Sequence, residues 1–316
     1  MTNERCVIYN AEKECTKLEN PKAGLRVYLF LAAVLSFGIL SGCSSAPKKP
    51  TEISSARIVA ANQLNLANQT ANQGRYEEAL LILTEARRGA LSTDDPELRI
   101  KTSMSRGNIL FSLGRHEEAF AEWENASAEG DASGQRVLAS LSRIYSIRGE
   151  LVLLANGMYA NGMYANDKEA AAEELKSRVN KEMALVKSDS LSTAASYVTL
   201  GLAEKQLERF PQAESAIKNA LSIHEKNLSL EDAAYDWFLI ASVRSVAGNY
   251  EPALEALRAA IGFDRRAENG FGLASSWQAM GEVYAKAGKA EEAKSAYSRA
   301  AEIFRAIGLE ELGIRN

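Results

Sequence analysis

Five segments of the chain share one pattern of apolar and polar positions. Each has alanine at its sixth and thirteenth places and an apolar or aromatic residue at its tenth, with charged or polar residues around them. Seven residues are two turns of an α-helix, so both alanines lie on one face. The pattern therefore predicts five amphipathic helices. Their sequences are GRYEEALLILTEA (74–86), GRHEEAFAEWENA (114–126), ERFPQAESAIKNA (208–220), GNYEPALEALRAA (248–260) and GKAEEAKSAYSRA (288–300).

A second helical segment precedes each of these, and it carries a small residue at a constant offset. The small residue lies twelve positions before the first alanine of the pattern, at Ala67, Gly107, Gly201, Ala241 and Gly281. Small residues let two helices approach closely, and the glycine or polar residues between the segments favour a turn. The sequence thus predicts repeated antiparallel helix pairs.

These pairs resemble the tetratricopeptide repeat. The segment WQAMGEVYAKAGKAEEAKSAYSRA (277–300) matches that family's consensus at Trp277, Met280, Gly281, Tyr284, Gly288, Ala293, Tyr297 and Ala300. The resemblance implies an all-α fold, a right-handed α-α superhelix of about six helix pairs, over residues 57–312. Stacked pairs of this kind form a concave groove lined mainly by the first helix of each pair.

The repeat period is forty residues, as between Ala79 and Ala119, whereas the family's usual repeat has about 34. We expect the extra residues to extend the second helices or to lengthen loops such as 91–98 and 227–234. A third pair is expected between the second and fourth copies, with its first helix at Gln135–Arg148. An insertion around 150–166, which contains the duplication NGMYANGMYA (156–165), is expected to distort it. The duplication is either a functional loop or a tolerated insertion.

The N-terminal region has a different pattern. Lys22 and Arg26 precede thirteen almost entirely apolar residues (28–40), and Leu40-Ser41-Gly42-Cys43 follows. This resembles the signal peptide and lipobox of bacterial lipoproteins. The resemblance implies cleavage after residue 42, a signal peptide (1–42) with a long n-region, and lipidation (palmitate) of Cys43. Residues 43–56 are expected to form a flexible tether. Ser44, rather than Asp, after the cysteine favours the outer membrane, with the protein facing the periplasm.

Composition and charge narrow the class of function. The formal net charge is −4, without the basic excess that nucleic-acid binding requires. We expect His116 to pack within a helix pair, where other copies have tyrosine, and His224 to be half-exposed near a helix end. The sequence shows no HExxH, CxxC, Walker-type or nucleophile-elbow motif. It therefore predicts a protein that is not an enzyme, with no cofactor and no metal site.

Recognition of a partner is the remaining class. By the repeat resemblance, groove-facing positions of the first helices include Asn68, Lys101, Met104, Asn108, Phe111, Arg136, Arg143, Lys205, Tyr235 and Phe238. Asparagine amides can pair with a peptide backbone, and arginines can bind a carboxylate. We interpreted Asn68, Asn108 and Arg143 as equivalent positions of three successive pairs.

Three hypotheses of function follow. The leading one is a lipid-anchored scaffold of the cell envelope that binds partner proteins or peptides in the assembly or regulation of an envelope machine. The second is an activator of a cell-wall (peptidoglycan) enzyme. The third, which is weaker, is a carrier of a small hydrophobic ligand in a central pocket. The predicted membrane association is through the lipid anchor.

Overall fold

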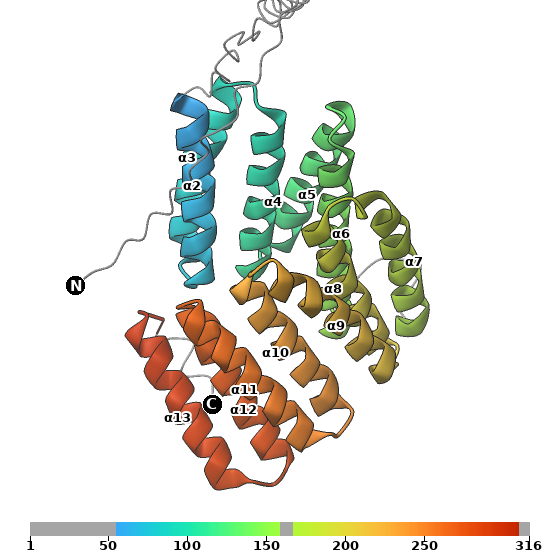
Figure 1. Cartoon of the computed structure of the whole chain (residues 1–316), viewed down its shortest axis with the longest axis vertical. Helices are drawn as coiled ribbons and strands as arrows, with labels where there is room; N and C mark the ends of the chain where they lie inside the picture. Colours follow the sequence, from blue (N-terminus) through green and yellow to red (C-terminus); the bar gives the residue numbers. More distant parts are fainter. Residues whose placement is uncertain (1–54, 159–166, 310–316) are drawn as a thin grey trace, which may run out of the picture. The chain divides into compact units, whose positions relative to one another are not determined.

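The computed structural model describes residues 55–158 and 167–309, and every regular element within them is an α-helix. Twelve helices form six pairs, and each helix packs on the next one along the chain (Figure 1). The predicted all-α fold of six helix pairs is confirmed. The pairs are α2 (Ser55–Asn72) with α3 (Tyr76–Ser92), α4 (Pro96–Ser112) with α5 (His116–Ala132), α6 (Arg136–Ala155) with α7 (Lys168–Val186), α8 (Ser190–Gln206) with α9 (Phe210–Lys226), α10 (Leu230–Val246) with α11 (Tyr250–Arg266), and α12 (Gly270–Lys286) with α13 (Ala290–Ala306).

The helices of a pair touch where the sequence places small residues. The patterned alanines of all five copies are at most 4% exposed. A Cβ atom at Gly107 would lie 2.5 Å from the Trp123 indole nitrogen, and one at Gly201 would lie 2.5 Å from the Ile217 side chain. Since real Cβ atoms essentially never come so close, glycine is required for these crossings. In the three copies with glycine at this position, the large residue at the tenth place of the pattern therefore fills the space that the glycine leaves.

Turns of three residues connect most of the helices. In nine of the ten such turns that the structure describes, the middle residue has a positive φ angle. In eight of these nine turns the third residue donates its N–H to the carbonyl five residues back, as Arg75 does to Thr70 at 3.2 Å. This is the Schellman arrangement, which satisfies the last carbonyls of the preceding helix. Glycine adopts the conformation without strain, but Leu228 adopts it too, with φ of 58°.

The forty-residue period comes from helix length. A typical pair has two helices of 17 residues and two turns of three. The extra residues therefore extend both helices of a pair. The prediction of long loops at 91–98 and 227–234 is wrong, because only residues 93–95 and 227–229 of these segments lie outside helices. Helical growth is favourable here because each added residue extends an already formed hydrogen-bond ladder.

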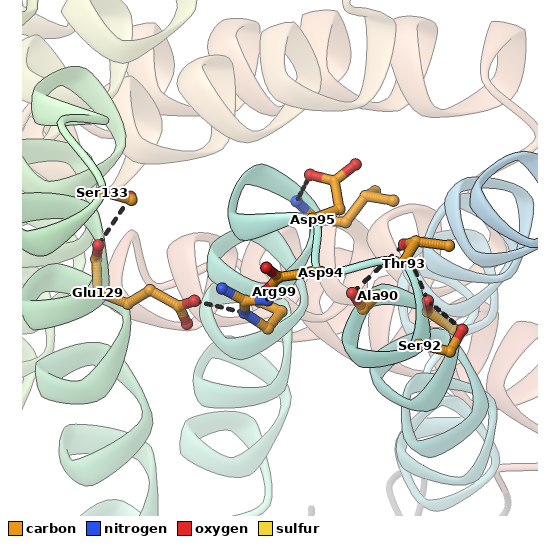
Figure 2. Close-up of polar contacts among 10 residues, drawn as sticks. Ala90, Ser92, Thr93, Asp94, Asp95, Arg99, Glu129 and Ser133 are labelled. Carbon is orange, nitrogen blue, oxygen red and sulfur yellow. Dashed lines mark hydrogen bonds and ion pairs between the residues drawn. The ribbon is translucent and has the colours of Figure 1, made fainter. Parts of the chain in front are cut away.

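The α3–α4 turn shows how such a junction is held (Figure 2). Asp95 is the N-cap of α4, and its side chain accepts a hydrogen bond from the Leu98 N–H at 3.1 Å, just before Pro96 opens the helix. Thr93 donates to the Gly89 carbonyl at 3.1 Å, which satisfies the end of α3. Arg99, one turn into α4, pairs with Glu129 of α5. Asp94-Asp95-Pro96 thus forms a turn that leads directly into α4.

The third pair is the irregular one, as expected, but its first helix is longer than predicted. α6 begins at Arg136 and continues to Ala155, beyond the predicted end at Arg148. The extension is held by an ion pair between Glu150 and Arg178 of α7, at 2.7 Å. Only Asn156, Gly157 and Met158 of the NGMYANGMYA duplication are described; the remainder lies outside the described residues.

The predicted signal peptide (1–42), the lipidation site Cys43 and most of the predicted tether (43–56) also lie outside the described residues, and α2 begins at Ser55. Among the helices of residues 55–158 and 167–309, none is both long and apolar enough to cross a bilayer.

Candidate functional site

The first helix pair approaches the last two pairs across the axis of the solenoid. Asn72, at the end of α2, donates a hydrogen bond to the Glu231 carboxylate at the start of α10. The Tyr76 ring of α3 meets the Phe271 ring of α12 edge to face, with centroids 6.0 Å apart. Because the solenoid curves back on itself, its concave groove becomes a cavity closed on several sides.

This axial cavity has a volume of about 700 Å³. It is lined mainly by first helices (α2, α4, α10 and α12, with one residue of α6), as the repeat resemblance implied. Its side chains fall into three groups of distinct chemistry. The amide group is Asn65, Asn68, Asn72 and Asn108; the aromatic group is Tyr76, Tyr145, Tyr235, Phe238 and Phe271; and the acidic group is Glu231, Asp232 and Asp264.

Six of the residues predicted to face the groove line this cavity: Asn68, Lys101, Met104, Asn108, Tyr235 and Phe238. Asn68 and Asn108 are exposed within it. The Asn108 side-chain oxygen accepts a hydrogen bond from the Trp123 indole N–H at 3.1 Å. That bond fixes the orientation of the amide and leaves its NH₂ group as a donor toward the cavity. The Tyr235 and Phe238 rings stack at 6.5 Å with an angle of 11° between their planes.

Four predicted groove residues lie elsewhere. Arg143 pairs with Asp131 of α5 and with Glu182 of α7 at 3.4 Å, so it bridges two second helices. Phe111 packs against Trp123 with ring centroids 5.6 Å apart. Arg136 is exposed at the first position of α6, and Lys205 donates to the Ser242 hydroxyl at 2.7 Å.

The equivalence of Arg143 with Asn68 and Asn108 is wrong in register. The forty-residue spacing of those asparagines continues to Arg148, not Arg143, because α6 begins forty residues after α4. Arg148 lies over the Tyr145 ring, 5.4 Å from its centroid, and donates to the carbonyl of Ala195 in α8 at 2.9 Å. Ser142, the small residue next to Arg143, donates its hydroxyl hydrogen to the Trp123 carbonyl at 2.8 Å.

The acidic group was not predicted. Asp264, near the end of α11, is only 3% exposed; its carboxylate accepts hydrogen bonds from Asn269 at 2.8 Å and Ser276 at 3.4 Å. The pKa of Asp264 is raised to about 6. Burial is the main cause, the charge of Glu231 adds to it, and the two hydrogen bonds partly oppose it. Burial and the neighbouring Asp232 also raise the pKa of Glu231, partly offset by the bond from Asn72. From the sequence alone, these acidic residues could not be distinguished from acidic residues that are exposed to solvent at helix ends.

The two histidines have different surroundings. His116 packs against Phe111 with ring centroids 4.7 Å apart, consistent with the predicted packing position. The expectation that His224 is half-exposed is wrong, because it is 7% exposed. Its Nδ1 lies 2.6 Å from a carboxylate oxygen of Asp236, which is fully buried in α10. A search of the described residues finds no group of three or more His, Cys, Asp or Glu side chains placed to hold a metal ion.

Comparisons with known proteins agree with this architecture. Residues 274–306, which span the last helix pair, match the tetratricopeptide repeat family. A Rap protein complexed with competence and sporulation factor is 16% identical, with 80% of this chain and 67% of that chain covered and a TM-score of 0.50. BtubC from P. vanneervenii is 15% identical over 79% of this chain and 92% of its own, with a TM-score of 0.45.

The type IV pilus biogenesis factor PilW is 13% identical over 80% of this chain and 97% of its own, with a TM-score of 0.44. A comparison with curated proteins gives no match. The likeness to the Rap protein concerns the fold alone. Taken with the family match of one repeat, the six helix pairs and the buried alanine register, it shows that the described chain has the tetratricopeptide-repeat fold.

Proposed function

We propose that the protein is a lipid-anchored scaffold of the bacterial cell envelope, which binds an extended segment of a partner protein in the axial cavity. The observation that carries the binding part is the cavity of about 700 Å³, in which exposed asparagine amides share the space with aromatic rings. Amides pair with a peptide backbone of any sequence, while rings bury its side chains. The tetratricopeptide fold is itself a scaffold for protein interaction.

The envelope part rests on sequence. An apolar run that ends at Leu40-Ser41-Gly42-Cys43 supports export and lipidation at Cys43. Acyl chains on one cysteine suffice for stable attachment, since each buried methylene contributes about 0.8 kcal/mol. The Cys43→Ala variant should leave the membrane fraction or remain uncleaved. A cleaved, unacylated variant that still fractionates with membranes would refute the anchor.

The carrier hypothesis receives less support from this cavity. Three carboxylates and five amides line it, and a purely apolar ligand would satisfy none of their remaining hydrogen-bonding capacity. A peptide can satisfy them, because each of its residues presents one donor and one acceptor.

Binding can be tested by capture of partners from detergent-solubilised envelopes with the full chain as bait. The variant Asn65→Ala/Asn68→Ala/Tyr235→Ala changes three exposed cavity residues. Each lost polar pairing costs about 0.5–1.5 kcal/mol, and about 1.4 kcal/mol is tenfold in affinity, so we expect at least tenfold weaker binding. Arg143→Ala is the matched control, since Arg143 faces second helices. Equal capture by the triple variant and the parent would place the interface elsewhere.

A further inference from the structure

One end of the axial cavity is negatively charged without counter-charges from the protein. Glu231 and Asp232 lie in the first turn of α10, and Asp264 lies opposite the α12 N-terminus. None of the three forms an ion pair within the described residues. Lys101 is the basic residue of the lining, and its ammonium group is already paired with Glu97 at 2.6 Å.

The fold does not require these acids. The residues that lie forty positions from Asp264, at equivalent places of neighbouring pairs, are His224 and Phe304. Those equivalent to Glu231 are Leu191 and Phe271, at the second positions of α8 and α12. Acids in a first helical turn interact favourably with the helix dipole, as Glu231 and Asp232 do in α10, but this effect is small. Asp264 lies near the end of α11, whose dipole disfavours it, and beside the start of α12, whose dipole favours it.

Asp264 is the informative member of this acidic group. Its carboxylate is 97% buried in a wall of the cavity, and both of its oxygens accept hydrogen bonds from neutral groups. A buried carboxylate without a cation nearby is costly to keep ionised. Gly272 makes room for it, because a Cβ atom at that position would collide with the Asp264 and Asn269 side chains. The backbone is thus shaped around a charged group that the protein leaves uncompensated.

Aromatic faces line the same cavity. Tyr235 and Phe238 lie one and two turns beyond the acidic start of α10, and their stacked rings face the cavity. Another ring of the lining, Tyr145, already has a cation over it, because Arg148 lies 5.4 Å from its centroid. Carboxylates beside aromatic rings favour a cation with an apolar stem, because the charge pairs with the acids while the stem and guanidinium or ammonium group pack on the rings.

We propose that this acidic end binds a lysine or arginine side chain of the partner's extended segment. The inference rests on the proposed function and specifies that the bound segment carries a positively charged side chain. The amides of Asn65, Asn68 and Asn108, on α2 and α4, pair with the backbone of the segment, and Glu231, Asp232 and Asp264 pair with its basic side chain.

The test uses the full chain in detergent micelles and a positional library of nine-residue peptides, in which one central position holds each amino acid in turn. We expect peptides with central Lys or Arg to be enriched at least tenfold over those with Glu or Leu, with the enrichment falling as salt is raised. The variant Glu231→Gln/Asp264→Asn, which changes charge but not shape, should lose that enrichment. The control Glu124→Gln/Glu292→Gln, exposed on second helices, should retain it.

The outcomes separate the two proposals. Two results would overturn the proposed basic ligand and leave the scaffold proposal standing. One is enrichment of peptides with an acidic or apolar central residue. The other is equal enrichment of basic peptides by the parent and the double variant. Absence of any enriched peptide would overturn both. Circular dichroism tests whether the Glu231→Gln/Asp264→Asn variant is folded. If it is not, the single variant Glu231→Gln, at a half-buried position, is compared with the parent in the same way.

Discussion

The α9–α10 and α11–α12 junctions occupy equivalent places, forty residues apart, but bury different chemistry. At the first, His224 and Asp236 form a buried pair at 2.6 Å. At the second, the same two positions hold Asp264 and Ser276, and their side-chain oxygens are 3.4 Å apart. One backbone arrangement therefore accepts a histidine, an aspartate or, at Phe304, an apolar ring at a single position.

The charges at the two junctions have different consequences. Burial alone lowers the pKa of His224, but the hydrogen bond and charge of Asp236 outweigh it, so the net pKa is raised. The pKa of Asp236 is also raised by burial, with partial opposition from His224. Each group of this pair compensates the other. Asp264 has neutral hydrogen-bond donors only and lies in the cavity wall, where the proposed basic side chain of a partner would compensate its charge.

The largest effect is expected at the compensated junction. His224→Ala leaves the fully buried Asp236 without a partner, and removal of one member of a buried ion pair costs about 3–5 kcal/mol. The double variant His224→Leu/Asp236→Ala removes both charges and should be within about 1 kcal/mol of the parent, because buried pairs exchanged for apolar residues are often neutral. Urea unfolding measures both. A double variant as unstable as the single one would show that the site depends on packing rather than on charge.

The uncompensated junction should behave in the opposite way. The pKa of Asp264 is about 6 in the folded chain against 3.8 for an ordinary aspartate, so the folded state binds a proton that the unfolded state does not between about pH 4 and 6. The free energy of unfolding therefore decreases as pH rises through this window. Asp264→Asn should remove this dependence and stabilise the protein above pH 6 by at most about 3 kcal/mol, with no gain below pH 4.

Thermal unfolding at several pH values provides the measurement, with exposed Glu124→Gln as the control, which should shift stability by under about 0.5 kcal/mol. An Asp264→Asn variant that is less stable than the parent at pH 8 would show that the carboxylate has a counter-charge in the folded chain. It would thereby weaken the proposal of a cationic ligand.

The helix pairs could be predicted because they are encoded locally. For example, Gly107 and Ala119, twelve residues apart, indicate a close crossing of two helices that are adjacent in the sequence. The regular register predicted Asn68 and Asn108 correctly, whereas Arg143 was misplaced in the third pair, where α6 departs from the regular length. Phe111 and Lys205 lie in helices of regular length but also do not line the cavity. Ser142, the small residue next to Arg143, resembles the small crossing residue of the other first helices, and this similarity misplaced Arg143.

The cavity itself could not be predicted, because its closure depends on small rotations summed over six pairs. Contacts such as Tyr76 with Phe271 join residues nearly two hundred positions apart, and no local pattern reports them. The polar junctions left a weak signal that could have been found. His224 and Asp264 lie at a position of the second helices that is otherwise apolar, and each has a polar residue, Asp236 or Ser276, twelve positions later.

The smallest expected effect compares the caps of the two junctions. Asn269 is the N-cap of α12, and its side chain accepts from the Gly272 N–H at 3.0 Å and donates to Asp264 at 2.8 Å. Ser229, at the equivalent N-cap of α10, forms no side-chain cap bond. Asn269→Ala should therefore cost about 1 kcal/mol, whereas Ser229→Ala should cost almost nothing. Loss of the donor should also raise the pKa of Asp264, because the amide stabilises its ionised form. Titration of the Asp264 carboxyl by NMR distinguishes this effect on the pKa from a simple capping effect. An unchanged pKa of Asp264 in Asn269→Ala would mean that Asn269 only caps the helix. The two junctions would then differ less than their contacts indicate.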